Sequence, residues 1–275
     1  MPTDQKTTSF PRRRESTTRG RGRLGSCVDP RLRGDDDTCG GAGIEHSVDS
    51  LATLALARLM TWLSPAYPVG SYSYSHGLEW LVEVGSVKNA ATLGDWIEDV
   101  LRYGAGRSDA VFLGKAWRAV TGGDERLLAE TVDLAAAFAP SAERRLETLG
   151  QGAAFLSATR SVWPAPELDR LAADGGEVAY PVAVGACAAV HGLPLAPTAQ
   201  AFVQAFAASL VSAGVRLIPL GQTDGLRVLA RLEPLIPRIA AAALAADLDD
   251  VGGAAVVADI ASMRHETQYT RLFRS

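Results

Sequence analysis

Apolar residues recur at steps of three and four along most of the chain after residue 50, and this period constrains the fold more than any other feature. Because an α-helix turns once every 3.6 residues, such steps place the apolar side chains on one helix face. Aromatic residues, which strands favour, make up only 7% of the chain. The period is clearest in three sets: Leu51, Ala55, Leu59 and Leu63; Leu93, Trp96, Ile97, Val100 and Leu101; and Leu229, Leu232, Ile236 and Ile239.

Capping residues, glycines and prolines set the expected helix ends. Ser50, Thr92 and Ser141 are expected N-caps, because a hydroxyl oxygen can accept from the free N–H groups of a first helical turn. We expect helices over 51–63, 71–84, 92–117 with a weak point at Gly104 and Gly106, 124–138, 141–163, 182–191, 198–217, from 222 with kinks at Pro234 and Pro237, and from 254. No segment has a convincing strand pattern. The sequence therefore predicts an all-α fold, a single-domain bundle of roughly eight to ten helices.

The first 46 residues differ from the rest. They contain PRRRES, RGRGR and three consecutive aspartates, with hardly any large apolar residue. Such a segment buries too little apolar surface to offset the entropy lost on ordering, so we expect a disordered extension over 1–46 and a helical domain over 47–275. The extension is either a translated upstream segment or a basic arm for a partner.

Composition narrows the class of protein. Apolar residues make up 47% and charged residues 21%, with a net charge of −4, which is an ordinary soluble balance and not that of a nucleic-acid binder. No run of about 20 apolar residues suggests a membrane helix, and no apolar run follows the basic N-terminus as in a secretory signal. The three cysteines, Cys27, Cys39 and Cys187, fit no disulfide or metal framework, so we expect a cytoplasmic protein.

Catalytic motifs are missing from the sequence. There is no GxxxxGK[ST] loop, His265-Glu266 does not continue as HExxH, and GSYSYSHG is not a GxSxG elbow. The four histidines are few for a metal store; His76 is expected to make a structural hydrogen bond and His191 to end a helix or pack in the core. Cys187 is expected to pack as a small apolar residue. We therefore predict no enzyme activity, no cofactor and no metal-binding residues.

Two segments have unusual turn chemistry. Residues 64–79, SPAYPVGSYSYSHGLE, hold two prolines, two glycines after them, and alternating tyrosines and serines. They form either a helix-to-helix turn or a preformed partner surface, in which tyrosines make amphipathic contacts. Residues 218–225, IPLGQTDG, break the chain at Pro219 and Gly221, and Thr223 or Asp224 is an expected N-cap of the next helix.

The C-terminal segment 262–275, SMRHETQYTRLFRS, is apolar for a chain end. It holds Met263, Tyr269, Leu272 and Phe273 among three arginines. Arginine and aromatic side chains are enriched at interface hot spots, so this tail is expected either to bind a partner or to fold back on its own domain.

Taken together, these three segments resemble those of the UreF family of urease accessory proteins. The likeness extends from about Leu51 to Ser275 and leaves 1–46 uncovered. It implies an all-helical, dimeric adaptor without enzyme activity of its own. The implied partners are the accessory protein UreD, also called UreH, the GTPase UreG and apo-urease. The assembly promotes carbamylation of a lysine and insertion of nickel into apo-urease, and UreF couples to or regulates the GTPase.

The resemblance also implies which residues bind partners. In the family the C-terminal tail becomes ordered on contact with UreD/UreH. The positions that match are Met263, Arg264, His265, Gln268, Tyr269, Leu272, Phe273 and Arg274 in the tail, Tyr72, Ser73, Ser75, Gly77 and Glu79 in the early segment, and Gln222 and Asp224 in the late turn.

Two other functions stay open on the residues alone. A helical enzyme could use scattered acids such as Glu79 and Asp224 around a pocket, and it would turn over a small molecule without a partner. A generic helical dimer would have only a structural role, and loss of its tail would have no further effect.

Overall fold

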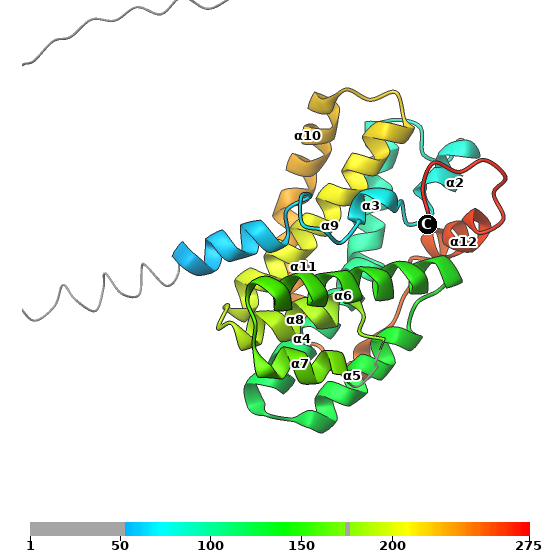
Figure 1. Ribbon diagram of the computed structural model, residues 1–275. Helices are drawn as coiled ribbons and strands as arrows, with labels where there is room; N and C mark the ends of the chain where they lie inside the picture. Colours follow the sequence, from blue (N-terminus) through cyan, green and yellow to red (C-terminus); the bar gives the residue numbers. More distant parts are fainter. Residues whose placement is uncertain (1–52, 174–176) are drawn as a thin grey trace, which may run out of the picture. The chain divides into compact units, whose positions relative to one another are not determined.

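The computed structural model describes residues 53–173 and 177–275, and within them every regular element is a helix. The predicted extension over 1–46, the Ser50 cap, Cys27, Cys39 and His46 lie outside the described residues. A helix runs over 53–62 and is followed by α2 (Leu78–Glu83), α3 (Ala90–Tyr103), α4 (Ala105–Gly122), α5 (Glu125–Ala137), α6 (Ala142–Val162), α7 (Pro166–Ala173), α8 (Tyr180–Val190), α9 (Leu195–Leu217), α10 (Gln222–Leu232), α11 (Ile236–Ala245) and α12 (Val256–His265). Short 3₁₀ turns are η1 (Ser71–Ser73), η2 (Glu233–Leu235) and η3 (Leu248–Asp250). The all-α prediction is confirmed for this part of the chain (Figure 1).

Helix caps explain several of these boundaries. Ser141 caps α6 as predicted, since its Oγ accepts from the backbone N–H of Arg144 at 3.1 Å. The predicted Thr92 cap is wrong: Asn89 caps α3, and Thr92 is the third helical residue, whose Oγ1 accepts in return from the Asn89 N–H at 3.2 Å. An Asn at the N-cap satisfies the free N–H groups as well as a hydroxyl does, so the helix begins one turn earlier.

Prolines and glycines shift other boundaries. The expected helix over 71–84 is split into η1 and α2, because His76 (φ 56°) and Gly77 (φ 76°) have left-handed backbone that no helix tolerates. Pro234 and Pro237 do not merely kink one helix; α10 ends, η2 intervenes and α11 begins. The predicted cap at Thr223 or Asp224 is also wrong, since Gly221 is the N-cap of α10.

The core is centred on α8, which is apolar on every face and buried from Pro181 to Ala188. It packs mainly against α4 and α6. At Gly185 an added Cβ would come within 2.3 Å of the carbonyl oxygen of Leu113, so glycine allows α4 and α8 to approach backbone to backbone. Cys187 is buried in the same helix as predicted, and burial raises the pKa of its thiol to about 12.

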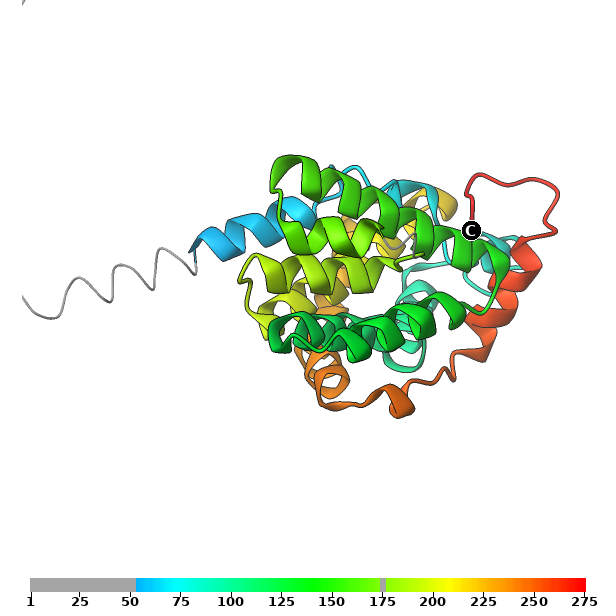
Figure 2. The same cartoon turned by 60° about the horizontal axis from the view of Figure 1, so that its bottom comes forward.

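A second part of the core lies between α3, α9, α10 and α11 and extends to α2 and Phe273. The connection from α11 to α12 runs along the outside of the helices and brings α12 beside α2 (Figure 2). The last residues are thereby placed against α2 and the turn before it.

One helix departs from the sequence expectation about membranes. By length and composition alone α9 could cross a membrane, although the sequence analysis expected no such stretch. Half of its most apolar window is buried inside the structure, and the core helix of a soluble protein meets the same criterion.

Candidate partner-binding site at the C-terminal tail

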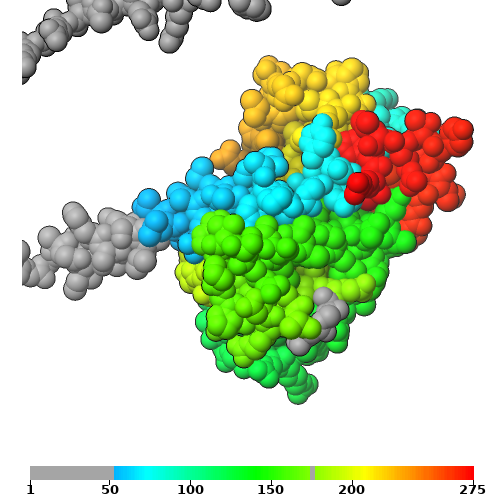
Figure 3. All heavy atoms as spheres, viewed as in Figure 1, coloured from blue at the N-terminus to red at the C-terminus, as the bar shows by residue number. Residues whose placement is uncertain are grey.

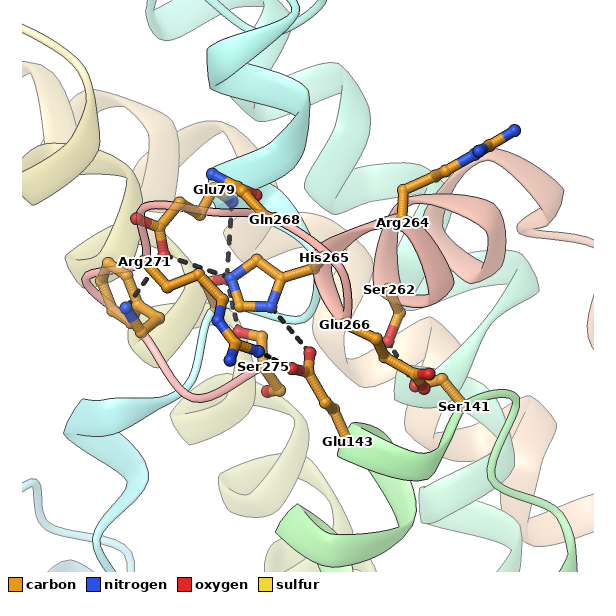
Figure 4. Close-up of polar contacts among 12 residues, drawn as sticks. Glu79, Ser141, Glu143, Ser262, Arg264, His265, Glu266, Gln268, Arg271 and Ser275 are labelled. Carbon is orange, nitrogen blue, oxygen red and sulfur yellow. Dashed lines mark hydrogen bonds and ion pairs between the residues drawn. The ribbon is translucent and has the colours of Figure 1, made fainter.

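Glu79 is the main anchor of the C-terminal tail. It lies in the first turn of α2 and is 8% exposed. Its carboxylate accepts hydrogen bonds from the backbone N–H groups of Leu272 at 2.6 Å and Phe273 at 2.9 Å (Figure 4). An ionised acceptor makes such bonds stronger than neutral ones, so one side chain fixes the backbone of two tail residues.

His265, at the end of α12, lies fully buried between two carboxylates. Its Nε2 is 3.2 Å from Glu79 and its Nδ1 is 2.7 Å from Glu143 of α6. The other oxygen of Glu143 accepts from Arg271 at 2.6 Å. Figure 4 shows the imidazole between these two acids, so α2, α6, α12 and the tail meet at one point.

The last two residues pair with the early segment. The main-chain oxygen of Ser275 accepts from the N–H of Ser75 at 2.6 Å and from the Ser75 Oγ at 2.5 Å. The Arg274 N–H donates to the carbonyl oxygen of Ser73 at 2.8 Å. The space-filling view shows the red C-terminal segment lying against the early segment and α6 (Figure 3). Residues far apart in sequence thus form one structure, which we call the tail dock: Ser73, Ser75 and Glu79 with 265–275.

Glycine at position 77 is required by this packing. A Cβ there would lie 2.5 Å from the backbone nitrogen of Ser262, and the left-handed φ of 76° disfavours any side chain. Gly77 is therefore a structural residue that lets α12 lie directly on the turn before α2, and it is buried.

Phe273 is the apolar anchor of the dock. Its side chain is 4% exposed and belongs to the core part around α3 and α9. The guanidinium of Arg216, on α9, lies 4.4 Å from the Phe273 ring and 3.7 Å from the Tyr72 ring, and it donates to the Tyr72 carbonyl oxygen at 2.8 Å. Arg216 is therefore sandwiched between the two predicted segments by cation–π contacts.

Other predicted tail residues point outward. Tyr269 is fully exposed, and Leu272 and Met263 are 68% and 49% exposed. Arg264 and Arg274 also have exposed side chains, whereas Gln268 is half-buried and donates to Glu83 at 2.5 Å. Val256, Val257 and Ile260 extend the exposed apolar surface along α12. These three residues were not predicted, although their spacing with Met263 indicates one helix face.

The late turn is separate from the dock. Gln222 is exposed, and Asp224 accepts from the Gly221 N–H at 3.3 Å and from Arg227 at 2.6 Å. Among the described residues, no hydrogen bond or ion pair joins either of them to the tail. The structure thus brings together the early segment, 64–79, and the tail, 262–275, but not the late turn, 218–225.

A buried charged cluster behind the dock was also missed. Ser275 donates through its Oγ to Glu147 of α6 at 2.6 Å, and Glu147 pairs with Arg144. Burial alone would raise the pKa of Glu147, but Arg144 and then His76 outweigh it and lower that pKa to about 2. The spacing was the available signal, since Glu143 and Glu147 are four residues apart in a helix with a strong N-cap, which puts both acids on one helix face.

His76 makes the structural contact that the sequence predicted. Its Nε2 lies 2.9 Å from both Arg144 and Glu147, and its ring packs against Phe206 at 4.8 Å between centroids. Burial, followed by the charge of Arg144, lowers the pKa of His76, so the neutral imidazole is favoured.

These features define a class of protein: an all-helical domain whose C-terminal tail is bound to it by buried carboxylates. The family model described as UreF matches residues 87–233. The urease accessory protein UreF of Rhodopseudomonas palustris (strain HaA2) is 56% identical over 222 residues, which cover 80% of this chain and 94% of that protein. The UreF proteins of Xanthobacter autotrophicus and Bradyrhizobium diazoefficiens are each 55% identical, over 86% and 80% of this chain and 96% and 92% of their own lengths. The chain belongs to the UreF family.

Proposed function

We propose that this protein is an adaptor of urease maturation and not an enzyme. In this proposal it dimerises in the cytoplasm and binds UreD/UreH and the GTPase UreG. The complex acts on apo-urease, promotes carbamylation of its lysine and insertion of nickel, and couples these steps to GTP hydrolysis by UreG. The observation that carries the proposal is the tail dock, found in a chain of the UreF family.

The dock has the properties of a partner-binding element. Tyr269, Leu272 and Met263 expose apolar surface near the arginines of the same segment, and such a clustered surface is typical of an interaction site. The tail backbone is held by carboxylates and serines, whose hydrogen bonds water or a partner can replace. A partner can therefore engage the outer side chains of the docked tail or capture the whole segment.

The test is light scattering coupled to size-exclusion chromatography. The full chain is mixed with UreD/UreH, and the same mixture is run with a chain that lacks residues 263–275. The expected result is a stable complex that disappears on truncation. A folded, intact chain that forms no complex with UreD/UreH would reject the adaptor proposal.

Truncation also removes His265 and Phe273, so a finer variant is needed. Tyr269→Ala with Leu272→Ala changes only exposed side chains and leaves every hydrogen bond of the dock in place. We expect unchanged melting and binding weakened by about tenfold or more, the effect of losing interface anchors worth over 1 kcal/mol. Leu56→Ala on the helix over 53–62, which also removes an exposed leucine but lies outside all three predicted partner-binding segments, is the matched control.

The function also predicts what the isolated chain does not do. GTP hydrolysis is expected to depend on UreG, and the purified chain alone is expected to release no phosphate from GTP. Nucleotide turnover that co-purifies with this chain and persists without UreG would favour the enzyme alternative.

A further inference from the structure

Two cavities, both partly open to solvent, meet at one group of polar side chains. The first has a volume of about 170 Å³ and the second about 150 Å³. Four residues line both: His76, Asp109, Arg144 and Thr148. A single water needs only about 10–15 Å³ of such space, so either cavity admits an anion of three or four heavy atoms.

Arg144 presents unused donors at this junction. Its side chain is 10% exposed, and its Nη1 is engaged by His76 and Glu147. Its Nε and Nη2 make no hydrogen bond to any described residue. An arginine has five N–H donors in a rigid fork that matches the two oxygens of a carboxylate, and the unused side of this fork can take a planar oxyanion.

Asp109, on α4, is the second unpartnered group. Its carboxyl makes no hydrogen bond or ion pair with any described residue, and the residue lines both cavities. Burial raises its pKa to about 7, Arg144 opposes the shift and Glu147 adds to it. At neutral pH a large share of Asp109 is therefore protonated, and its O–H can donate to a ligand.

We propose that the junction of the two cavities binds a small oxyanion, of carboxylate or bicarbonate size, between Arg144 and Asp109, which line both cavities. The Thr148 Oγ1 accepts from the Tyr180 N–H at 3.3 Å, which leaves its own O–H to donate to the same ligand. This site goes beyond the adaptor function, since no partner protein contributes to it; its one link to the tail dock is Glu147, which pairs with Arg144 and accepts from Ser275.

The same groups disfavour a metal ion. The guanidinium of Arg144 repels a cation at the junction, and the described residues contain no group of three or more His, Cys, Asp or Glu side chains placed to hold one. Glu147 is already paired with Arg144, and the neutral form of His76 is favoured. Asp259 lines the first cavity, and burial raises its pKa despite Arg144, so it too adds less negative charge than an exposed acid.

The proposal has a signature in its pH dependence. An anion beside Asp109 favours the protonated carboxyl, so binding takes up a proton and must tighten as pH falls through the pKa of Asp109. A cation would release that proton and bind more tightly as pH rises. The sign of the slope therefore separates the two kinds of ligand.

Titration calorimetry of the full chain with sodium formate tests this directly, with sodium chloride at equal ionic strength as the reference. Formate stays ionised between about pH 6 and pH 8, so any change in affinity there belongs to the protein. We expect saturable binding that tightens by up to about tenfold per pH unit on the alkaline side of the Asp109 pKa. Sodium bicarbonate at about pH 8 then shows which of the two oxyanions is preferred.

Two variants locate the site. Asp109→Asn keeps a donor but cannot titrate, so formate should still bind, with an affinity that no longer depends on pH. Arg144→Gln should weaken binding by about tenfold or more, as expected for loss of a charged bidentate contact. Since loss of Arg144 leaves Glu147 buried without its partner and can unfold the chain, Asp109→Asn is the decisive variant.

Three results would overturn the proposal. They are the absence of saturable formate binding, an affinity that rises with pH, and an unchanged pH slope in Asp109→Asn, which would place the anion elsewhere on the chain.

Discussion

The contact between α4 and α8 and the dock of the C-terminal tail are both buried, but they are built from opposite materials. The helix contact is made of small and apolar residues, with Gly185 under the backbone of Leu113 and no charged partner between them. The tail dock is made of carboxylates, serines and a histidine around a single apolar anchor, Phe273.

The difference decides which part can leave. Separating α4 from α8 would expose the centre of the core, and nothing outside could replace the close packing lost. Releasing the tail exposes one phenylalanine and several polar groups. Water can form hydrogen bonds with all of these polar groups. The fold therefore contains an irreplaceable contact and an exchangeable one, and stability measurements can tell them apart.

The largest effect is expected from Gly185→Val. Its Cβ would clash with the Leu113 carbonyl oxygen, and neither helix backbone can move without opening the core. Overpacking alone costs about 1–3 kcal/mol, and a clash with backbone at the centre of the domain is expected to exceed this and to prevent stable folding at 37 °C. Circular dichroism shows whether the Gly185→Val variant folds, and urea unfolding measures its loss of stability.

Gly122→Ala is the matched control for that variant. Gly122 ends α4, and an added Cβ meets nothing within 4 Å. Alanine there should stabilise slightly, by up to about 1 kcal/mol. If both variants unfolded at the same urea concentration, close packing at Gly185 would not be the constraint that the geometry indicates.

Glu79→Ala is expected to release the tail and leave the domain folded. Two backbone N–H groups and His265 lose their acceptor, at a cost of about 1–3 kcal/mol. The loss has an upper limit, because a detached tail regains water as a partner. Hydrogen exchange at residues 272–275 should become fast while α8 stays protected.

The neighbouring Glu83→Ala provides the comparison. Glu83 is exposed and accepts one hydrogen bond, from Gln268. Glu83→Ala should change neither the midpoint of urea unfolding nor the rate of hydrogen exchange in the tail. Slow exchange at 272–275 in Glu79→Ala would mean that Phe273 alone holds the tail, and the polar half of the comparison would fail.

Phe273→Ala should cost about 1–2 kcal/mol, less than the 3–5 kcal/mol usual for a phenylalanine in the centre of a core. The reason is again that the tail can detach. Since both variants lead to the same released tail, the double variant with Glu79→Ala should cost little more than the larger single change. Leu272→Ala, which removes an exposed side chain next to it, should have no effect on urea unfolding.

Strictly additive losses in that double variant would contradict the idea of one cooperative dock. The result also bears on the partner proposal, because Phe273 and Tyr269 lie on opposite sides of the tail. Phe273→Ala tests release of the tail, whereas Tyr269→Ala tests the surface that the docked tail presents.

Periodic patterns in the sequence predicted the helices well, because each helix face is encoded by residues three and four apart. Ser141 was found for the same local reason. The division of the tail into an inner and an outer side was not predictable, since Phe273 is turned inward by Glu79, a residue almost two hundred positions away. The chemical pattern identified the segment but not the direction of its side chains.

The buried charged cluster was not predicted from the sequence, for a different reason. Asp109 lies on α4 and Arg144 and Glu147 lie on α6, and charged residues on helices usually face solvent. Only the packing of α4 and α6 around the cavities buries them. Thr92 shows the local limit: it was predicted as the N-cap, but Asn89 and Thr92 form one reciprocal motif in which Asn89 is the cap.

The last prediction concerns the pH dependence of stability that Asp109 causes. The apolar contact between α4 and α8 causes no such dependence, because it is made of small and apolar residues. The pKa of Asp109 is raised by burial from 3.8 to about 7 in the folded state. Between these values the folded chain holds a proton that the unfolded chain releases, so this group makes stability fall as pH rises. Below about pH 4 both states are protonated, and above about pH 7 the penalty is complete.

Asp109→Asn removes this penalty, so the variant should match the parent near pH 4 and exceed it near pH 8 by about 1.4 kcal/mol for each unit by which the pKa is raised, measured by urea unfolding at both values. Glu147, whose pKa is lowered to about 2, stays ionised over that whole range and does not confuse the comparison. Asp133→Asn, at an exposed position on α5, should show no such change with pH. An equal difference between variant and parent at both pH values would mean that Asp109 is ionised in the fold like an exposed acid, and the cavity beside it would then be as well solvated as the surface.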